Sequence, residues 1–141
     1  MCIRDRVDGE GAFILPHKFL NSKNGKSLRE FLMNRKSIHK LLHFGANRVF
    51  KGADTFTSVI YFNNKINNEF QFYRTPYRAD WSQEMNKAGN YSRVSYDRIE
   101  QSSKLYGTKE WHILENIEEY EILTKIYSLS LIHISEPTRP Y

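Results

Sequence analysis

One glycine-rich turn in the sequence resembles a motif that binds nucleotides. Gly9-Glu10-Gly11 could form a glycine loop around phosphate groups. Such a loop needs a strand before it and a helix after it. Here the apolar residues 12–15 follow the turn instead, so a plain turn is the better interpretation.

Histidines and carboxylates are the other residue types that could do chemistry. The four histidines of the natural segment show no metal-ligand spacing with Cys or Asp partners: His17, His39, His43 and His112. Asp54 has no second carboxylate at a spacing that suits an acid–base pair. We therefore predict structural histidines, no metal site, and no catalytic residue within this chain.

Four segments that must position any site are predicted to be strands. Residues 12–15 form an apolar run that stops at Pro16, which is typical of a strand buried on both faces, as in a parallel sheet. Residues 38–44 and 56–62 are further candidates, and the second is rich in β-branched and aromatic residues. After a turn, residues 69–73 are expected to return as the antiparallel partner of residues 56–62.

One helix is predicted between the first two strands, over residues 27–34. Ser27 as N-cap and Glu30 three residues later indicate a capping box. Arg29 is expected to be solvated or at the sheet edge. Three apolar side chains follow the helical i, i+3, i+4 spacing and should pack on the sheet: Leu28, Phe31 and Leu32.

The texture changes after Tyr73. Residues 75–110 are polar and show no sustained periodicity, apart from a possible short strand at 94–99, so we place a boundary or linker there. A short apolar piece follows at 111–114, and residues 117–127 have the pattern of an amphipathic helix. The order strand, helix, strand, hairpin predicts the late part of an α/β sheet rather than a whole domain.

Both ends of the chain have an unusual relationship. Codons for residues 1–6 (MCIRDR) can be written as the reverse complement of codons for residues 129–134 (LSLIHI). Two unrelated protein segments are not expected to be opposite strands of one DNA word, so we interpret 1–6 and 129–141 as translated sequencing adapter, to be excluded from fold reasoning. The natural part is then an internal fragment, and the single cysteine, Cys2, lies outside it.

Composition sets broad limits on function. Without those ends, the chain has 18 basic and 14 acidic residues, which is mildly basic and compatible with a polyanionic partner. No run approaches the roughly 20 apolar residues of a membrane span. We predict a soluble, cytoplasmic, prokaryotic protein without a membrane or metal partner.

Five elements in order carry a family resemblance: residues 11–16, 28–32 (LREFL), 38–45, Val49–Phe50 and 55–62. Together they resemble the second half of the catalytic domain of gamma-class, TaqI-like DNA adenine-N6 methyltransferases, including type IIG restriction–modification enzymes. Residues 111–127 resemble the segment that leads into the target recognition domain of that family. Thr75-Pro76-Tyr77 lacks the second proline and the acid or amide of the family's catalytic Asn-Pro-Pro-Tyr loop.

The resemblance implies the following domain organisation and activity. Residues 7–74 are the late part of a Rossmann-like, S-adenosylmethionine-dependent methyltransferase sheet, and 75–128 are a linker and helix toward a missing recognition domain. The parent would methylate adenine N6 in double-stranded DNA, with S-adenosylmethionine as methyl donor. The S-adenosylmethionine motifs and the Asn-Pro-Pro-Tyr loop precede Val7 in this class, so the fragment alone is expected to be inactive.

The resemblance also assigns site residues. A base must be flipped out of the duplex before its amino group can react, and the aromatic of the Val-Phe loop stacks on the extruded adenine. Phe50 takes that role here, although from the pattern alone it could be a core or loop-anchoring residue. Lys51 would lie near the DNA backbone. Pro16 and His17 are possible pocket-wall residues or simply the end of a strand.

A second hypothesis is a non-catalytic nucleic-acid-binding module. Its aromatic residues would stack on single-stranded bases and its arginines would bind phosphates. The same mixture is typical of an aromatic-rich linker. The residues concerned are Tyr73, Tyr77, Trp81, Tyr91, Tyr96, Arg74, Arg78 and Arg93.

Overall fold

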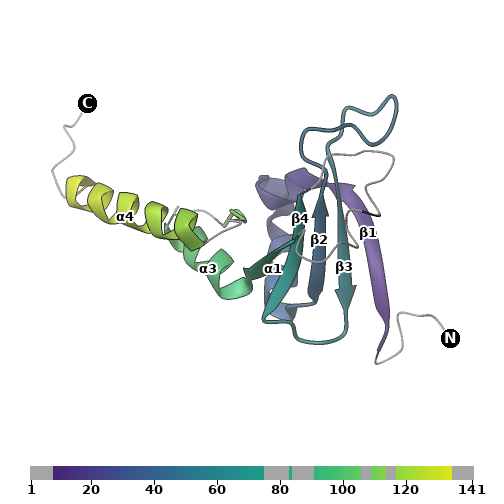
Figure 1. The fold of residues 1–141 in the computed structure, drawn as a ribbon, viewed down its shortest axis with the longest axis horizontal. Coiled ribbons are helices and arrows are strands. Elements are labelled where there is room, and N and C mark those ends of the chain that lie inside the picture. The colour runs from purple at the N-terminus through teal and green to yellow at the C-terminus, as the bar shows by residue number, and fades with distance from the viewer. Residues whose placement is uncertain (1–7, 75–82, 84–90, 106–108, 114–116, 135–141) are drawn as a thin grey trace.

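A mixed five-stranded sheet with helices on one face forms the body of the protein (Figure 1). The computed structural model describes residues 8–74, 83, 91–105, 109–113 and 117–134. In chain order the elements are β1 Glu10–Pro16, η2 His17–Leu20, η3 Lys23–Gly25, α1 Lys26–Arg35, β2 Ile38–His43, β3 Thr57–Asn63, β4 Glu69–Arg74, β5 Ser92–Ser95, α3 Tyr96–Leu105 and α4 Ile117–Ile134. The predicted α/β class is confirmed.

The sheet has the strand order β1-β3-β2-β4-β5. β3 runs antiparallel to both β1 and β2, whereas β4 runs parallel to β2. The predicted hairpin between β3 and β4 is therefore wrong, because β2 lies between these two strands. The connection passes below β2, where the Asn67 N–H and side-chain amide both donate to the Lys36 carbonyl, at 2.8 and 3.1 Å.

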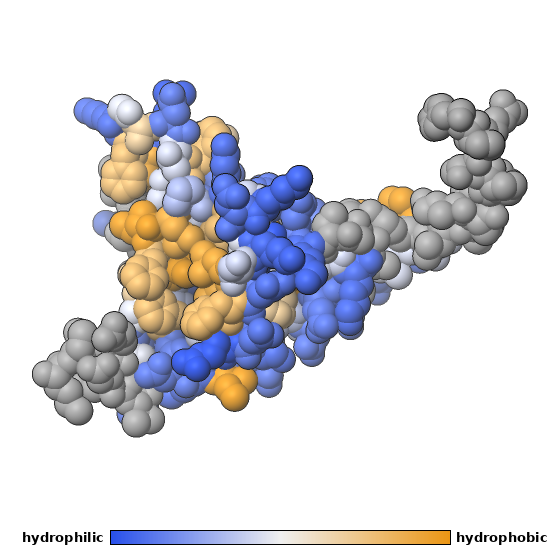
Figure 2. Space-filling model, turned by 180° about the vertical axis from the view of Figure 1, so that it is seen from behind, coloured by the Kyte–Doolittle hydropathy of each residue, from blue (hydrophilic) through white to orange (hydrophobic). Residues whose placement is uncertain are grey.

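β1 differs from its prediction. It is an edge strand of the described sheet and pairs antiparallel with β3, not parallel. Phe13 and Ile14, on opposite faces of the strand, are 62% and 64% exposed. The expectation of burial on both faces is wrong because nothing in the described part of the chain covers this edge. Apolar side chains gather over this side of the molecule, at the left of the view from behind (Figure 2).

The predicted helix is confirmed as α1, but its start and its faces differ. It begins at Lys26 with Gly25 as N-cap, so the predicted capping box at Ser27 is wrong. Leu28 and Leu32 pack on the core as expected, whereas Phe31 is 57% exposed. Arg29, expected in solvent, is only 4% exposed.

Two apolar clusters lie on opposite faces of the sheet. Neighbouring residues of a strand point to opposite faces, so Leu41 joins the cluster on the α1 face and Leu42 joins the other. The larger cluster contains Phe19, Leu20, Leu32, Ile38, Leu41, Ile60, Phe70, Phe72, Val94, Tyr96, Ile99 and Trp111. The core of the sheet thus includes residues from β5, from α3 and from the segment before α4.

Tyr96 fixes α3 to the sheet. Its side chain is fully buried, and its hydroxyl accepts from the Ile38 N–H at 2.9 Å and lies 3.2 Å from the Ile38 carbonyl, to which it donates. Burial raises the pKa of this phenol, so it stays neutral. The short strand predicted at 94–99 is correct only in its first part, because the chain turns into α3 at Tyr96.

α4 is longer than predicted and runs to Ile134. It extends away from the sheet beyond α3 (Figure 1). None of the described helices combines the length and apolar character that crossing a membrane requires.

The open edge makes a prediction about solubility. We expect the chain alone to associate through β1, because an unpaired strand edge can pair with another copy. Ile14→Lys should raise the monomeric fraction in analytical ultracentrifugation, since a lysine on an edge disfavours such pairing and Ile14 makes little packing.

Ile66→Lys is the matched control. Ile66 is 79% exposed in the β3–β4 connection, so it takes no part in the strand pairing of β1. Equal gains from the two lysines would mean that added charge, rather than edge pairing, governs association.

Candidate functional site

Three strands end at one edge of the sheet and bring distant residues together. Pro16 of β1 pairs with Thr57, His43 of β2 pairs with Ser58, and His43 also pairs with Arg74 of β4. β1, β2 and β4 therefore deliver their carboxyl ends to the place where β3 begins. Binding sites of α/β sheets gather at such an edge.

His17 follows β1 directly and lies within this group. The backbone N–H of His17 donates to the Phe56 carbonyl at 3.0 Å. The His17 ring stacks on the Phe56 ring, with 5.5 Å between centroids. The His43 ring lies 4.9 Å away on centroids. Burial, followed by the charge of Lys18, lowers the pKa of His17. Its Nδ1 is buried, and no described group bonds to it.

His43 holds the start of the loop that carries Phe50. Its Nδ1 accepts the Gly45 N–H at 2.9 Å, and Gly45 has a φ of +63°, a conformation that glycine adopts without strain. Burial lowers the pKa of His43 to about 4, with the charges of His17 and Arg74 as smaller causes. A neutral imidazole can accept this bond, whereas an imidazolium cannot.

The loop at residues 44–56 presents Phe50 outward. The preceding residue, Val49, packs against the cluster of Leu42 and its neighbours. Phe50 is 49% exposed, which argues against the interpretation as a core residue. Arg48 and Asp54 form an ion pair across the loop at 3.0 Å, and Lys51 is exposed beside Phe50. The loop therefore offers an aromatic face with a cation next to it.

Sequence reasoning missed His43 as a partner of His17. The signal was present, because each histidine stands at the end of a predicted strand, and parallel strands end side by side. The described residues contain no group of three or more His, Cys, Asp or Glu side chains that could hold a metal ion. At the carboxyl ends of the strands, the chain offers the exposed Phe50 ring for stacking and the His43 imidazole that anchors its loop.

Comparison with known proteins finds relatives among restriction–modification enzymes. Residues 4–50 match the family described as Eco57I restriction-modification methylase. The chain is 36% identical over 69 residues to the type II restriction enzyme and methyltransferase RM.Eco57I of Escherichia coli, covering 49% of this chain and 7% of that protein. It is 40% identical over 57 residues to the type II methyltransferase M.HincII of Haemophilus influenzae, covering 40% of this chain and 11% of that protein.

The fold has relatives among solved structures as well. A chain from a type I restriction–modification system aligns with a TM-score of 0.61 over 95% of this chain and 37% of its own length. Identity is 11%, so this likeness supports the fold alone. The chain therefore shares its fold with part of that restriction–modification protein, and it spans a small part of the curated relatives it matches.

The neutral His43 makes a prediction about pH. The folded pKa of about 4 lies below the usual 6.5, so the unfolded chain binds the extra proton and stability falls as the pH drops from about 6.5 toward 4. His43→Asn keeps a side-chain oxygen that can accept the Gly45 N–H but cannot titrate. We expect urea denaturation between pH 7 and pH 4 to show a smaller loss of stability in this variant. An unchanged pH dependence would mean that His43 does not contribute to it.

Proposed function

We propose that the chain is part of a gamma-class DNA methyltransferase that methylates adenine N6 within a specific sequence, in a restriction–modification or phage-defence system. The observation that carries this proposal is Phe50, half-exposed on a loop at the carboxyl edge of the sheet. The family match to residues 4–50 includes this phenylalanine and supports the assignment.

The proposed reaction gives roles to the residues at the carboxyl ends of the strands. S-adenosylmethionine supplies the methyl group, and none of the described residues is assigned to bind it. Extruding the base costs a few kcal/mol, and stacking on Phe50 offsets about 1–3 kcal/mol of that cost. Lys51 would contact a backbone phosphate, and Pro16 and His17 would form one wall of the base pocket.

The open β1 edge supports the idea that further strands complete this sheet. Exposed apolar residues on both faces of an edge strand are unusual in a complete domain. We assign the cofactor motifs and the catalytic loop to parent sequence preceding Val7, and the bulk of the recognition domain to parent sequence following Tyr127. On this view, residues 75–128 connect the two parts, and residues 1–6 and 129–141 derive from adapter.

The nucleic-acid-binding module is the less favoured function. Two of its aromatic residues, Tyr73 and Tyr96, are 5% and 0% exposed and belong to the core. Arg93 is paired with Glu69 at 2.8 Å. Tyr77, Arg78 and Trp81 lie outside the described residues. The aromatic residues that the structure describes are therefore mainly packing residues rather than a stacking surface.

Substitution of Phe50 tests the proposal in the complete enzyme encoded by the extended reading frame. Phe50→Ala should lower kcat/KM for duplex DNA by about ten- to a hundredfold, because one stacking contact is lost. Phe50→Trp should retain most of the activity. Phe31→Ala is the matched control, since Phe31 is 57% exposed on α1, away from the edge. Equal losses at the two positions would contradict the stacking role.

A second experiment tests the division of the parent protein. Residues 1–141 alone should neither bind S-adenosylmethionine in calorimetry nor transfer methyl groups to duplex DNA. Longer DNA reads should reveal an S-adenosylmethionine glycine loop and an Asn-Pro-Pro-Tyr motif upstream of Val7. Methyl transfer by the 141-residue chain, or a stop codon directly upstream of Val7, would contradict the proposal.

A further inference from the structure

A buried arginine joins two segments that are far apart in the sequence. Arg29 is 4% exposed, and its guanidinium donates to three backbone carbonyls. Nη1 donates to the Phe19 oxygen at 2.5 Å and to the Ser22 oxygen at 2.7 Å, while Nε donates to the Lys109 oxygen at 2.8 Å. Phe19 lies in η2, Ser22 lies between η2 and η3, and Lys109 lies before α4.

The absence of a side chain at Gly25 leaves space for the Arg29 guanidinium. A Cβ atom on Gly25 would lie 2.3 Å from the Phe19 oxygen and 2.9 Å from the Arg29 Nη1, which no side chain tolerates without a shift. Close to the Lys109 acceptor, the backbone N–H of Trp111 donates to the backbone oxygen of Leu20 at 2.8 Å. Arg29 thus stands where residues 19–22 and residues 109–111 meet.

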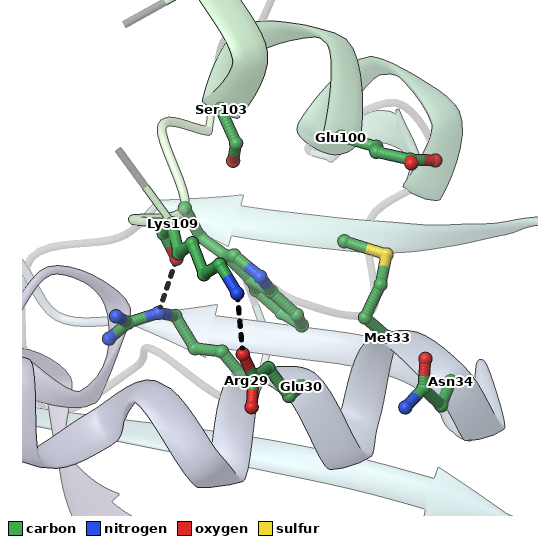
Figure 3. Close-up of a pocket in the computed structure, with 8 residues that line it drawn as sticks. Arg29, Glu30, Met33, Asn34, Glu100, Ser103 and Lys109 are labelled. Atoms are coloured by element: carbon green, nitrogen blue, oxygen red, sulfur yellow. Dashed lines mark hydrogen bonds and ion pairs between the residues drawn. The ribbon is translucent and has the colours of Figure 1, made fainter. Parts of the chain in front are cut away.

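Besides Arg29, the Trp111 backbone N–H on the Leu20 oxygen and the edge-on contact of the Phe19 and Trp111 rings, 6.4 Å between centroids, also join these segments. A cavity of about 370 Å³ separates α1 from α3 beside Lys109 and Trp111, with Glu30, Met33 and Asn34 on the α1 side (Figure 3). The Lys109 side chain reaches Glu30 at 3.1 Å along the wall of this cavity, and this ion pair is exposed (Figure 3). Exposed pairs contribute little, so the buried bonds of Arg29 are the stronger attachment.

The charge of Arg29 is held by dipoles rather than by a direct carboxylate bond. Burial lowers the pKa of the guanidinium, and the charges of Glu110 and Glu30 oppose this effect. Arginine nevertheless stays protonated in proteins. Loss of the guanidinium would remove the buried bond to the Phe19 carbonyl, which is costly, whereas the Ser22 carbonyl would keep the Gly25 N–H at 3.2 Å.

We propose that Arg29 is a positioning residue that couples residues 109–111 to residues 17–22. This role rests on the proposed function, in which 109–111 lead through α4 to the recognition domain and His17 forms the pocket wall. Docking of the recognition domain on DNA would then be transmitted to the base pocket through the contacts that this guanidinium organises.

Hydrogen exchange of the 141-residue chain, followed by mass spectrometry, tests the coupling without any need for methylation. Arg29→Lys keeps the charge but cannot serve three carbonyls in this geometry. We expect exchange about tenfold faster or more in peptides covering both 17–22 and 109–113. A peptide covering β3 should not change.

Lys109→Ala is the matched control. It removes the side-chain pair with Glu30 but keeps the backbone oxygen that Arg29 binds, so exchange should stay within about twofold. Faster exchange in only one of the two segments after Arg29→Lys, or no change in either, would overturn the proposal. If Arg29→Lys does not fold, Gly25→Ala decides, because its methyl group disturbs the same contacts and should give the same two-segment pattern.

Kinetics of the complete enzyme separate coupling from stability. Arg29→Lys should lower kcat about tenfold or more while KM for S-adenosylmethionine stays constant, and Lys109→Ala should change neither. An unchanged kcat alongside faster exchange in both segments would overturn the functional coupling. A complete wild-type protein without methyltransferase activity would instead contradict the proposed function and leave the exchange result standing.

Discussion

The antiparallel insertion of β3 between β1 and β2 is the constraint on which the rest of the structure depends. Because β3 occupies the inner edges of both neighbours, β1 and β2 must run in the same direction, and α1 must carry the chain from one to the other. Their carboxyl ends then meet at the start of β3. The histidine pair and the loop that carries Phe50 are consequences of this single choice of strand order.

Three polar side chains position the loops and connections around this sheet, and each does so by hydrogen bonds to backbone groups. Tyr96 binds both polar groups of Ile38, His43 accepts the amide that opens its loop, and Arg29 collects three carbonyls. Unpaired backbone groups in a core cost about 1–3 kcal/mol each. The side chains therefore fix loops and connections that the two apolar clusters cannot specify, since apolar packing has no direction.

The sequence predicted local structure well and pairing poorly. β2, β3 and α1 were visible because β-branched runs and the i, i+3, i+4 pattern are local signals. The partner of β4 was not visible, since a short turn favours a hairpin unless another strand already fills the place. Arg29 was misjudged for a similar reason. Leu28 and Leu32 indicated the buried face of α1. The long side chain of Arg29 nevertheless reaches around the helix to carbonyls in another segment.

The candidate site shows the same division between local and non-local information. The sequence left open whether Phe50 of the Val49–Phe50 pair is a core residue, because only the fold decides which of the two residues points inward. Val49 is drawn to the cluster of Leu42, and a chain that buries one residue of a tight loop turns the next one outward. Exposure of an aromatic ring carries a cost in water. The bond from the Gly45 N–H to His43 and the packing of Val49 anchor the loop, and these contacts keep the ring from collapsing onto the sheet.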